Sequence, residues 1–119
     1  LARFMLALKV NLAQSSSVAT MIFDEVDAGV GGATAQAVGE RLARLARDVQ
    51  VLVVTHSPQV AACGNNHFKV EKSTADNVTT TTVRELTKIE KSEEIARMLA
   101  GEVITDAARA AAKVLIGAE

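Results

Sequence analysis

Apolar residues recur at helical spacing in two early parts of the chain. The spacing predicts a helix over residues 1–13, followed by a polar connector over residues 14–17. A second helix is expected over residues 33–47, with Val38, Leu42 and Leu45 facing inward. The face expected inside the first helix consists of Leu1, Phe4, Met5, Leu8 and Leu12.

Two short apolar runs with β-branched members predict buried strands over residues 18–23 and 49–54. The first run passes into a glycine-rich loop over residues 24–32. The second precedes Ser57-Pro58, which suits the N-cap and first position of a short helix ending near Cys63. The order strand, helix, strand, helix predicts a βαβ unit with parallel strands.

The rest of the chain predicts a β-hairpin and two helices. Strands are expected over residues 67–72 and 78–86, around a turn at residues 73–77. Ser92 is the expected N-cap of a helix over residues 92–100, and Thr105 that of a helix ending near Gly117. Within the first of these helices, the residues expected to face inward are Ile95, Met98 and Leu99.

The two predicted parallel strands end in polar, chemically active residues. Asp24-Glu25 follows the first strand and Thr55-His56 follows the second. Parallel strands present their carboxyl ends at one edge of the sheet, where ligands of such sheets bind. An apolar strand followed by Asp-Glu has the form of a Walker B segment, in which one carboxylate orients Mg²⁺ and the next aligns or deprotonates an attacking water.

Composition excludes several functional classes. The 119 residues suit one domain, and 13 basic against 14 acidic side chains give a net charge of −1, so a bulk electrostatic grip on nucleic acid or anionic lipid is not expected. Three Phe are the only aromatics, which disfavours a base-stacking platform. The single Cys63, expected to fill a small core position, excludes an internal disulfide and favours a reducing, cytosolic setting. His67 is expected to be a surface or edge histidine without a catalytic role. No segment has the pattern of a signal peptide or a membrane span.

Four segments together resemble the C-terminal part of the RecN family, bacterial DNA double-strand-break repair ATPases that are related to SMC proteins and have an ABC-type head. The segments are Leu1–Leu8, Ile22-Phe23-Asp24-Glu25-Val26-Asp27-Ala28-Gly29-Val30-Gly31-Gly32, Val53-Val54-Thr55-His56-Ser57-Pro58-Gln59-Val60-Ala61 and Glu94-Ile95-Ala96-Arg97-Met98-Leu99-Ala100-Gly101. The resemblance implies an α/β fold: the C-terminal lobe of an ABC/SMC-type P-loop ATPase head over residues 1–119, with a parallel βαβ core, a β-hairpin and C-terminal helices.

The resemblance also implies roles for individual residues, with ATP and Mg²⁺ as cofactors. Asp24 would orient the metal, Glu25 would be the catalytic base, and His56 would be the switch histidine facing the γ-phosphate. Asp27 and Gly29 would bind nucleotide from the D-loop, residues 26–32, which communicates across a dimer of heads. Arg3, one turn from the ABC signature motif, would contribute to the same composite site. Where other ABC heads end the D-loop with Asp, this chain has Gly31.

The sequence contains neither the Walker A pattern G-x-x-x-x-G-K-[ST] nor the Ser-Gly-Gly of the ABC signature, which we expect to precede Leu1. The chain is therefore expected to be a fragment that neither binds ATP tightly nor hydrolyses it alone. Its expected partners are the N-terminal lobe of the same protein, a second ATPase head and, through the full-length protein, DNA. The expected location is the bacterial cytoplasm, at the nucleoid.

Three other hypotheses fit some of these features. The chain could belong to the head of another SMC-like chromosome-maintenance ATPase. It could be a non-catalytic interaction module in which Asp24, Glu25 and His56 are vestigial. A metal-dependent hydrolase using the same three residues as direct ligands is a further alternative, although nothing in the sequence supplies its substrate specificity.

Overall fold

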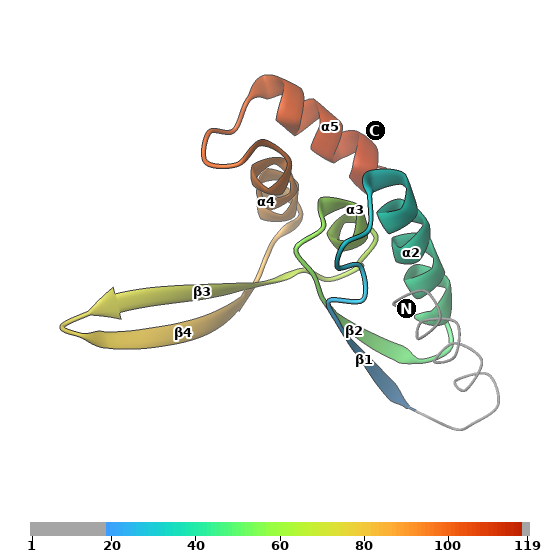
Figure 1. Ribbon diagram of the computed structural model, residues 1–119, viewed down its shortest axis with the longest axis horizontal. Helices are drawn as coiled ribbons and strands as arrows, with labels where there is room; N and C mark the ends of the chain where they lie inside the picture. The colour runs from blue at the N-terminus through green and yellow to red at the C-terminus, as the bar shows by residue number, and fades with distance from the viewer. Residues whose placement is uncertain (1–18, 118–119) are drawn as a thin grey trace. The chain divides into compact units, whose positions relative to one another are not determined.

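The computed structural model describes residues 19–117 and divides the chain into two compact units, with the boundary between Cys63 and Gly64 (Figure 1). Each unit is described by itself below. The helix expected over residues 1–13, together with Arg3, lies outside the described residues. The assignment of residues 1–119 to one ATPase-head lobe remains a prediction.

The first unit contains the predicted βαβ arrangement. Its elements are β1 (Thr20–Asp24), α2 (Gly32–Leu45), β2 (Gln50–Val54) and α3 (Pro58–Ala62). Strands β1 and β2 are parallel neighbours, paired from Thr20 opposite Gln50 to Asp24 opposite Val54. The helix α2 begins one residue earlier than expected, because Gly31 serves as its N-cap and accepts the Ala35 N–H at 2.8 Å. The predicted parallel unit is confirmed.

The core of this unit lies on one face of the two strands. Phe23 is fully buried, and Met21, Val51 and Val53 pack against the same cluster, which includes the α2 residues Ala35, Val38, Leu42 and Leu45 and the α3 residue Val60. The inward face predicted for this helix is therefore confirmed. The expectation of buried strands holds for this face only, because Ile22, Leu52 and Val54 point to the other face and are about half exposed or more.

Helices α2 and α3 approach each other closely at Gly39. A Cβ atom at this position would lie 2.7 Å from Cys63 Sγ and 3.2 Å from both Gln59 O and Val60 Cα, so a side chain does not fit without movement. Cys63 forms the C-cap of α3 and its Sγ lies at this crossing, but the residue is only partly buried and does not fill the core position expected of it. Ser57 caps α3 as predicted, since its Oγ accepts the Val60 N–H.

The second unit starts with the antiparallel hairpin of β3 (Phe68–Ala75) and β4 (Val78–Glu85), which Figure 1 shows as a long two-stranded ribbon. The predicted turn over residues 73–77 is too long, because Ser73 and Thr74 pair with Thr80 and Thr79. The connection is only Asp76-Asn77, with φ of 51° and 62°. Positive φ at both central residues is the geometry of a type I′ turn, whose twist matches that of the strands.

Helix α4 (Lys88–Ala100) begins before the predicted start. Thr87 is its N-cap, in a capping box: Thr87 Oγ1 accepts the Glu90 N–H at 3.2 Å, and Glu90 Oε1 accepts the Thr87 N–H at 3.1 Å. Glu90 also forms an ion pair with Arg84 of β4. The prediction of Ser92 as the cap is therefore wrong, because Ser92 lies inside the helix.

The inward face of α4 differs partly from the prediction. Ile95 is fully buried as expected and Met98 is partly buried, but Leu99 is exposed. Glu94 and Ala96 are buried in addition to Ile95. Helix α5 (Asp106–Ile116) packs beside α4 and is followed by Gly117, which has a φ of 78°. Its N-cap at Thr105 and its end near Gly117 are as predicted.

Glu94 is a buried carboxylate, 8% exposed, that joins the hairpin to α4. Arg97 Nε donates to Glu94 Oε1 at 2.9 Å, and Lys69 Nζ of β3 lies 3.1 Å from Glu94 Oε2. Burial alone would raise the pKa of Glu94, but the hydrogen bonds from Arg97 and Lys69 outweigh it and leave the pKa below its usual value. The carboxylate is therefore held in its charged form.

His67 is less exposed than the expected edge histidine. Its side chain is partly buried, and Nδ1 is buried without a hydrogen-bond partner. Burial, and then the positive charge of Lys91, lower the pKa of His67. Among residues 19–117, no helix has the length and apolar character needed to span a membrane.

Candidate functional site

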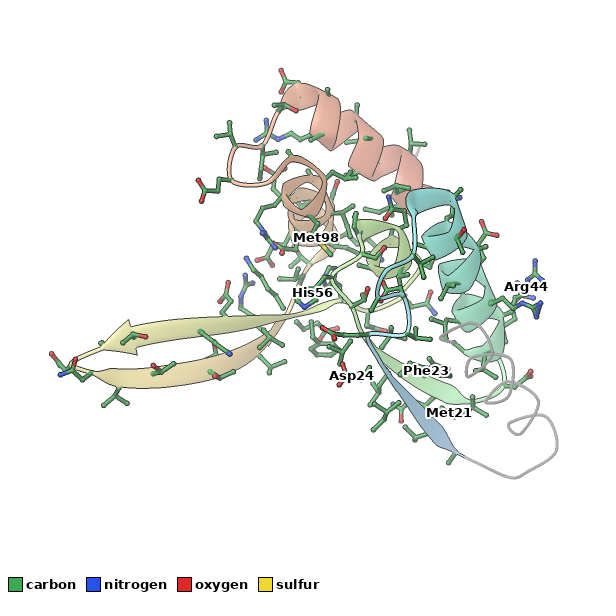
Figure 2. The ribbon with its side chains drawn as sticks, viewed as in Figure 1. Met21, Phe23, Asp24, Arg44, His56 and Met98 are labelled. Atoms are coloured by element: carbon green, nitrogen blue, oxygen red, sulfur yellow. The ribbon has the colours of Figure 1, made fainter. Side chains whose placement is uncertain are left out.

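The predicted functional edge lies at the carboxyl ends of β1 and β2. Asp24 is opposite Val54 in the sheet, and the Glu25 N–H donates to Val54 O at 2.9 Å, which extends the pairing one residue further. Figure 2 shows Asp24 and His56 where the chain leaves these two strands. The prediction that Asp24-Glu25 and Thr55-His56 reach one edge is confirmed.

Glu25 and His56 lie close to each other at this edge. His56 Nε2 is 3.3 Å from Glu25 Oε1, although the two side chains are 90% and 55% exposed. Glu25 has a φ of 51°, a left-handed conformation that is unfavourable for residues other than glycine and asparagine. Such strain at the end of a strand is typical of functional sites, where the surrounding backbone holds a side chain in place.

Backbone hydrogen bonds within the loop after Glu25 stabilise its conformation. The Ala28 N–H donates to Glu25 O at 3.0 Å, and the Val30 N–H donates to Asp27 O at 3.1 Å. Gly29 has a φ of 74°, and a Cβ atom there would meet nothing within 4 Å. The requirement for glycine is therefore conformational, not steric.

Asp27 lies inside the first unit and not at its surface. It is 7% exposed, and its Oδ2 accepts a hydrogen bond from the Thr55 hydroxyl. The Ser57 N–H donates to the same Thr55 oxygen at 2.9 Å. The sequence places Thr55 at this edge, directly before His56, but no role was predicted for its hydroxyl. Direct binding of nucleotide by Asp27 and Gly29 remains a prediction.

The donor set of this edge fits a metal that takes few ligands from protein. The described residues contain no group of three or more His, Cys, Asp or Glu side chains able to hold a metal ion together, so Asp24, Glu25 and His56 do not form a three-ligand site. Mg²⁺ commonly takes one or two carboxylates and completes its shell with phosphates and water. The exposed Asp24 at the end of β1 suits that arrangement.

The fold is similar to that of a solved SMC ATPase structure. A solved structure described under "Structural biochemistry of ATP-driven dimerization and DNA stimulated activation of SMC ATPases" matches 86% of this chain and 61% of its own, with a TM-score of 0.65 and 18% identity. No family model matches the sequence.

Curated protein sequences include relatives with a much higher sequence identity than this structure. The chain is 47% identical to DNA repair protein RecN of Rickettsia felis over 116 residues, 51% identical to that of Mycobacterium leprae over 118 residues, and 45% identical to that of Bacillus subtilis over 116 residues. These matches cover 98–99% of the chain but only 20–21% of each relative. The chain is therefore homologous to the C-terminal region of RecN and spans about a fifth of the length of these proteins.

Proposed function

We propose that the chain is the C-terminal half of an ATP-hydrolysing head in a RecN-type DNA double-strand-break repair ATPase. The observation that carries the proposal is the convergence of Asp24, Glu25 and His56 at the carboxyl edge of two parallel strands, with 3.3 Å between the Glu25 and His56 side chains. The RecN relatives at 45–51% identity favour this assignment over another SMC-like ATPase, since the SMC structure shares only 18% identity.

Each of the three residues would have a separate task. Asp24 would hold Mg²⁺, which neutralises the developing charge of the phosphoryl groups. Glu25 would accept a proton from, or align, the attacking water as a general base. His56 would donate a hydrogen bond to the γ-phosphate and, with Nε2 beside Glu25, would link recognition of that phosphate to the base.

The proposal requires partners that supply the missing parts of the site. A Walker A segment in the N-terminal lobe of the same protein would bind most of the triphosphate. A second head would close on the D-loop that contains Gly29, and Arg3 would contribute to the same composite nucleotide site. DNA would be bound through the full-length protein in the bacterial cytoplasm, at the nucleoid.

The test is reconstitution of ATP hydrolysis from two polypeptides. Residues 1–119 are purified alone, mixed with the N-terminal region of a RecN protein, and assayed with ATP and Mg²⁺. Hydrolysis is expected only in the mixture, and Glu25→Gln should abolish it while ATP binding by the mixture is retained. Hydrolysis by the chain alone that Glu25→Gln abolishes, or a mixture without activity despite association of the two parts, would contradict the proposal.

A further inference from the structure

We propose that Asp27 and Thr55 are positioning residues that hold Glu25 and His56 in register for ATP hydrolysis, without touching the nucleotide themselves. This inference rests on the proposed function of the same edge. It gives Asp27 a different role from the nucleotide-binding one that the family resemblance implies, and it adds Thr55, which that resemblance does not assign.

The two residues form a bridge between the segments that carry the active side chains. Asp27 follows Glu25 by two positions in the loop after β1, and Thr55 directly precedes His56 after β2. The Thr55 hydroxyl donates to the Asp27 carboxylate. This side-chain hydrogen bond therefore joins the loop that carries Glu25 to the strand end that carries His56. Thr55 directly follows Val54, whose carbonyl oxygen accepts the Glu25 N–H.

The Thr55 hydroxyl has a fixed polarity in this bridge. A hydroxyl has one proton, and the Thr55 hydroxyl donates it in the hydrogen bond to Asp27. Its oxygen lone pairs are therefore left to accept the Ser57 N–H at 2.9 Å. The same side chain thus fixes the backbone on both sides of His56. Valine has the shape of threonine but neither the donor nor the acceptor, whereas serine keeps both.

Asp27 is buried, whereas the side chains of Glu25 and His56 are exposed, so loss of a hydrogen bond costs more at Asp27. At 7% exposure, Asp27 would lose a hydrogen bond with little access to water if Thr55 lost its hydroxyl. Glu25 and His56 are themselves exposed, so their side-chain packing does little to fix the 3.3 Å between them. Their separation therefore depends on the position of the backbone. The Asp27–Thr55 hydrogen bond is a side-chain contact that restrains this backbone.

Misplacement of reacting groups by about 1 Å can reduce a rate about 100-fold even when the mutated residue does not touch the substrate. Loss of the bridge should therefore lower kcat with little change in the affinity for ATP. A residue in contact with nucleotide would instead change KM and the ATP dissociation constant.

The experiment uses the full-length RecN-type protein carrying Thr55→Val, Thr55→Ser or Asp27→Leu, with Thr80→Val on the exposed β4 as the matched control. Leucine has a shape similar to aspartate but no acceptor for the Thr55 hydroxyl. We expect Thr55→Val and Asp27→Leu to lower kcat by about 10- to 100-fold with KM within about 3-fold of wild type. Thr55→Ser should restore kcat to within about 3-fold, and Thr80→Val should leave it unchanged. Wild-type kcat in Thr55→Val, or a parallel loss of ATP binding in both low-activity variants, would overturn the proposal.

A second measurement separates the bridge from the proposed ATPase activity. Amide hydrogen exchange at Ser57 should be faster in Thr55→Val than in wild type and near wild type in Thr55→Ser, because Ser57 N–H donates to the Thr55 hydroxyl. If the wild-type protein hydrolyses no ATP, the proposed function fails while this measurement still tests the bridge. An unchanged Ser57 exchange rate in Thr55→Val would overturn the positioning role whatever the activity.

Discussion

His56 Nε2 lies 3.3 Å from Glu25 Oε1 at the carboxyl edge of the parallel strands, and the backbone of Glu25 has a φ of 51°. A left-handed conformation costs a residue such as glutamate about 1–2 kcal/mol. The backbone conformation of the proposed base therefore lowers the free energy of unfolding of the first unit.

Glu25→Gly should separate these two effects. The free energy of unfolding is expected to rise by up to about 1 kcal/mol, since glycine tolerates positive φ, while ATP hydrolysis in the reconstituted protein is lost with the carboxylate. Urea unfolding and the ATPase assay give the two readouts. Asn77→Gly is the control, because Asn77 has a φ of 62° in the hairpin turn and its substitution should stabilise without affecting hydrolysis. A less stable Glu25→Gly variant would show that the Glu25 side chain stabilises the fold.

Thr87→Ala and Ser92→Ala test where α4 begins. Thr87→Ala removes the side-chain half of the capping box and should lower the free energy of unfolding by about 1 kcal/mol. Ser92→Ala lies within the helix, where alanine is the better helix former, and should be neutral or slightly stabilising. Chemical unfolding followed by circular dichroism gives both values. The reverse order of the two effects would place the cap at Ser92 and contradict the observed helix start.

Gly39→Ala and Gly32→Ala test the crossing of α2 and α3. A Cβ at Gly39 would meet Cys63 Sγ and the backbone of Gln59 and Val60 at 3.2 Å or less, so Gly39→Ala should cost about 1–3 kcal/mol of stability. A Cβ at Gly32 would meet only the Gln59 Nε2 atom, at an ordinary 3.5 Å. Gly32→Ala should therefore leave the free energy of unfolding unchanged or raise it. Thermal unfolding of both variants and of wild type provides the measurement. Equal effects of the two substitutions would argue against the close approach.

Glu94→Gln tests the buried carboxylate that joins β3 to α4. Because the folded-state pKa of Glu94 is below its unfolded value, its charged form stabilises the fold above the unfolded pKa, and this contribution is lost as the pH falls through the folded pKa. At pH 7 the substitution should cost about 1–2 kcal/mol. Below about pH 4 the difference from wild type should shrink.

Urea unfolding of wild type and Glu94→Gln across this pH range provides the measurement, with the exposed Glu102→Gln as the control. Glu102→Gln should change stability little at any pH. A Glu94→Gln difference that stays constant from pH 7 to pH 3 would show that the carboxylate does not act through its charge.

The part of the fold set by local pattern could be predicted from sequence. Residues 18–23 and 49–54 have the apolar, β-branched character of strands, and Ser57-Pro58 has the chemistry of a helix start. The shared edge then follows from the topology of a parallel βαβ unit, so the proximity of Asp24-Glu25 to Thr55-His56 needed no knowledge of packing.

The remaining features depend on contacts between distant residues. Both Thr87 and Ser92 have N-cap chemistry, and the earlier cap is joined by Glu90, which also pairs with Arg84 of β4. Glu94 is not among the residues predicted to face inward in its helix, and its burial is compensated by Lys69 and Arg97. The Asp27–Thr55 bridge spans 28 positions, so no local pattern could indicate that the Asp27 side chain turns inward.

The outward row of Ile22, Leu52 and Val54 has a practical consequence for handling this polypeptide. Parallel strands in proteins are normally covered on both faces, and uncovered apolar strands attract further copies. Concentrated preparations should accordingly form reversible oligomers and scatter light, and dilute samples or a charged substitution at Leu52 would keep the material monodisperse for spectroscopy.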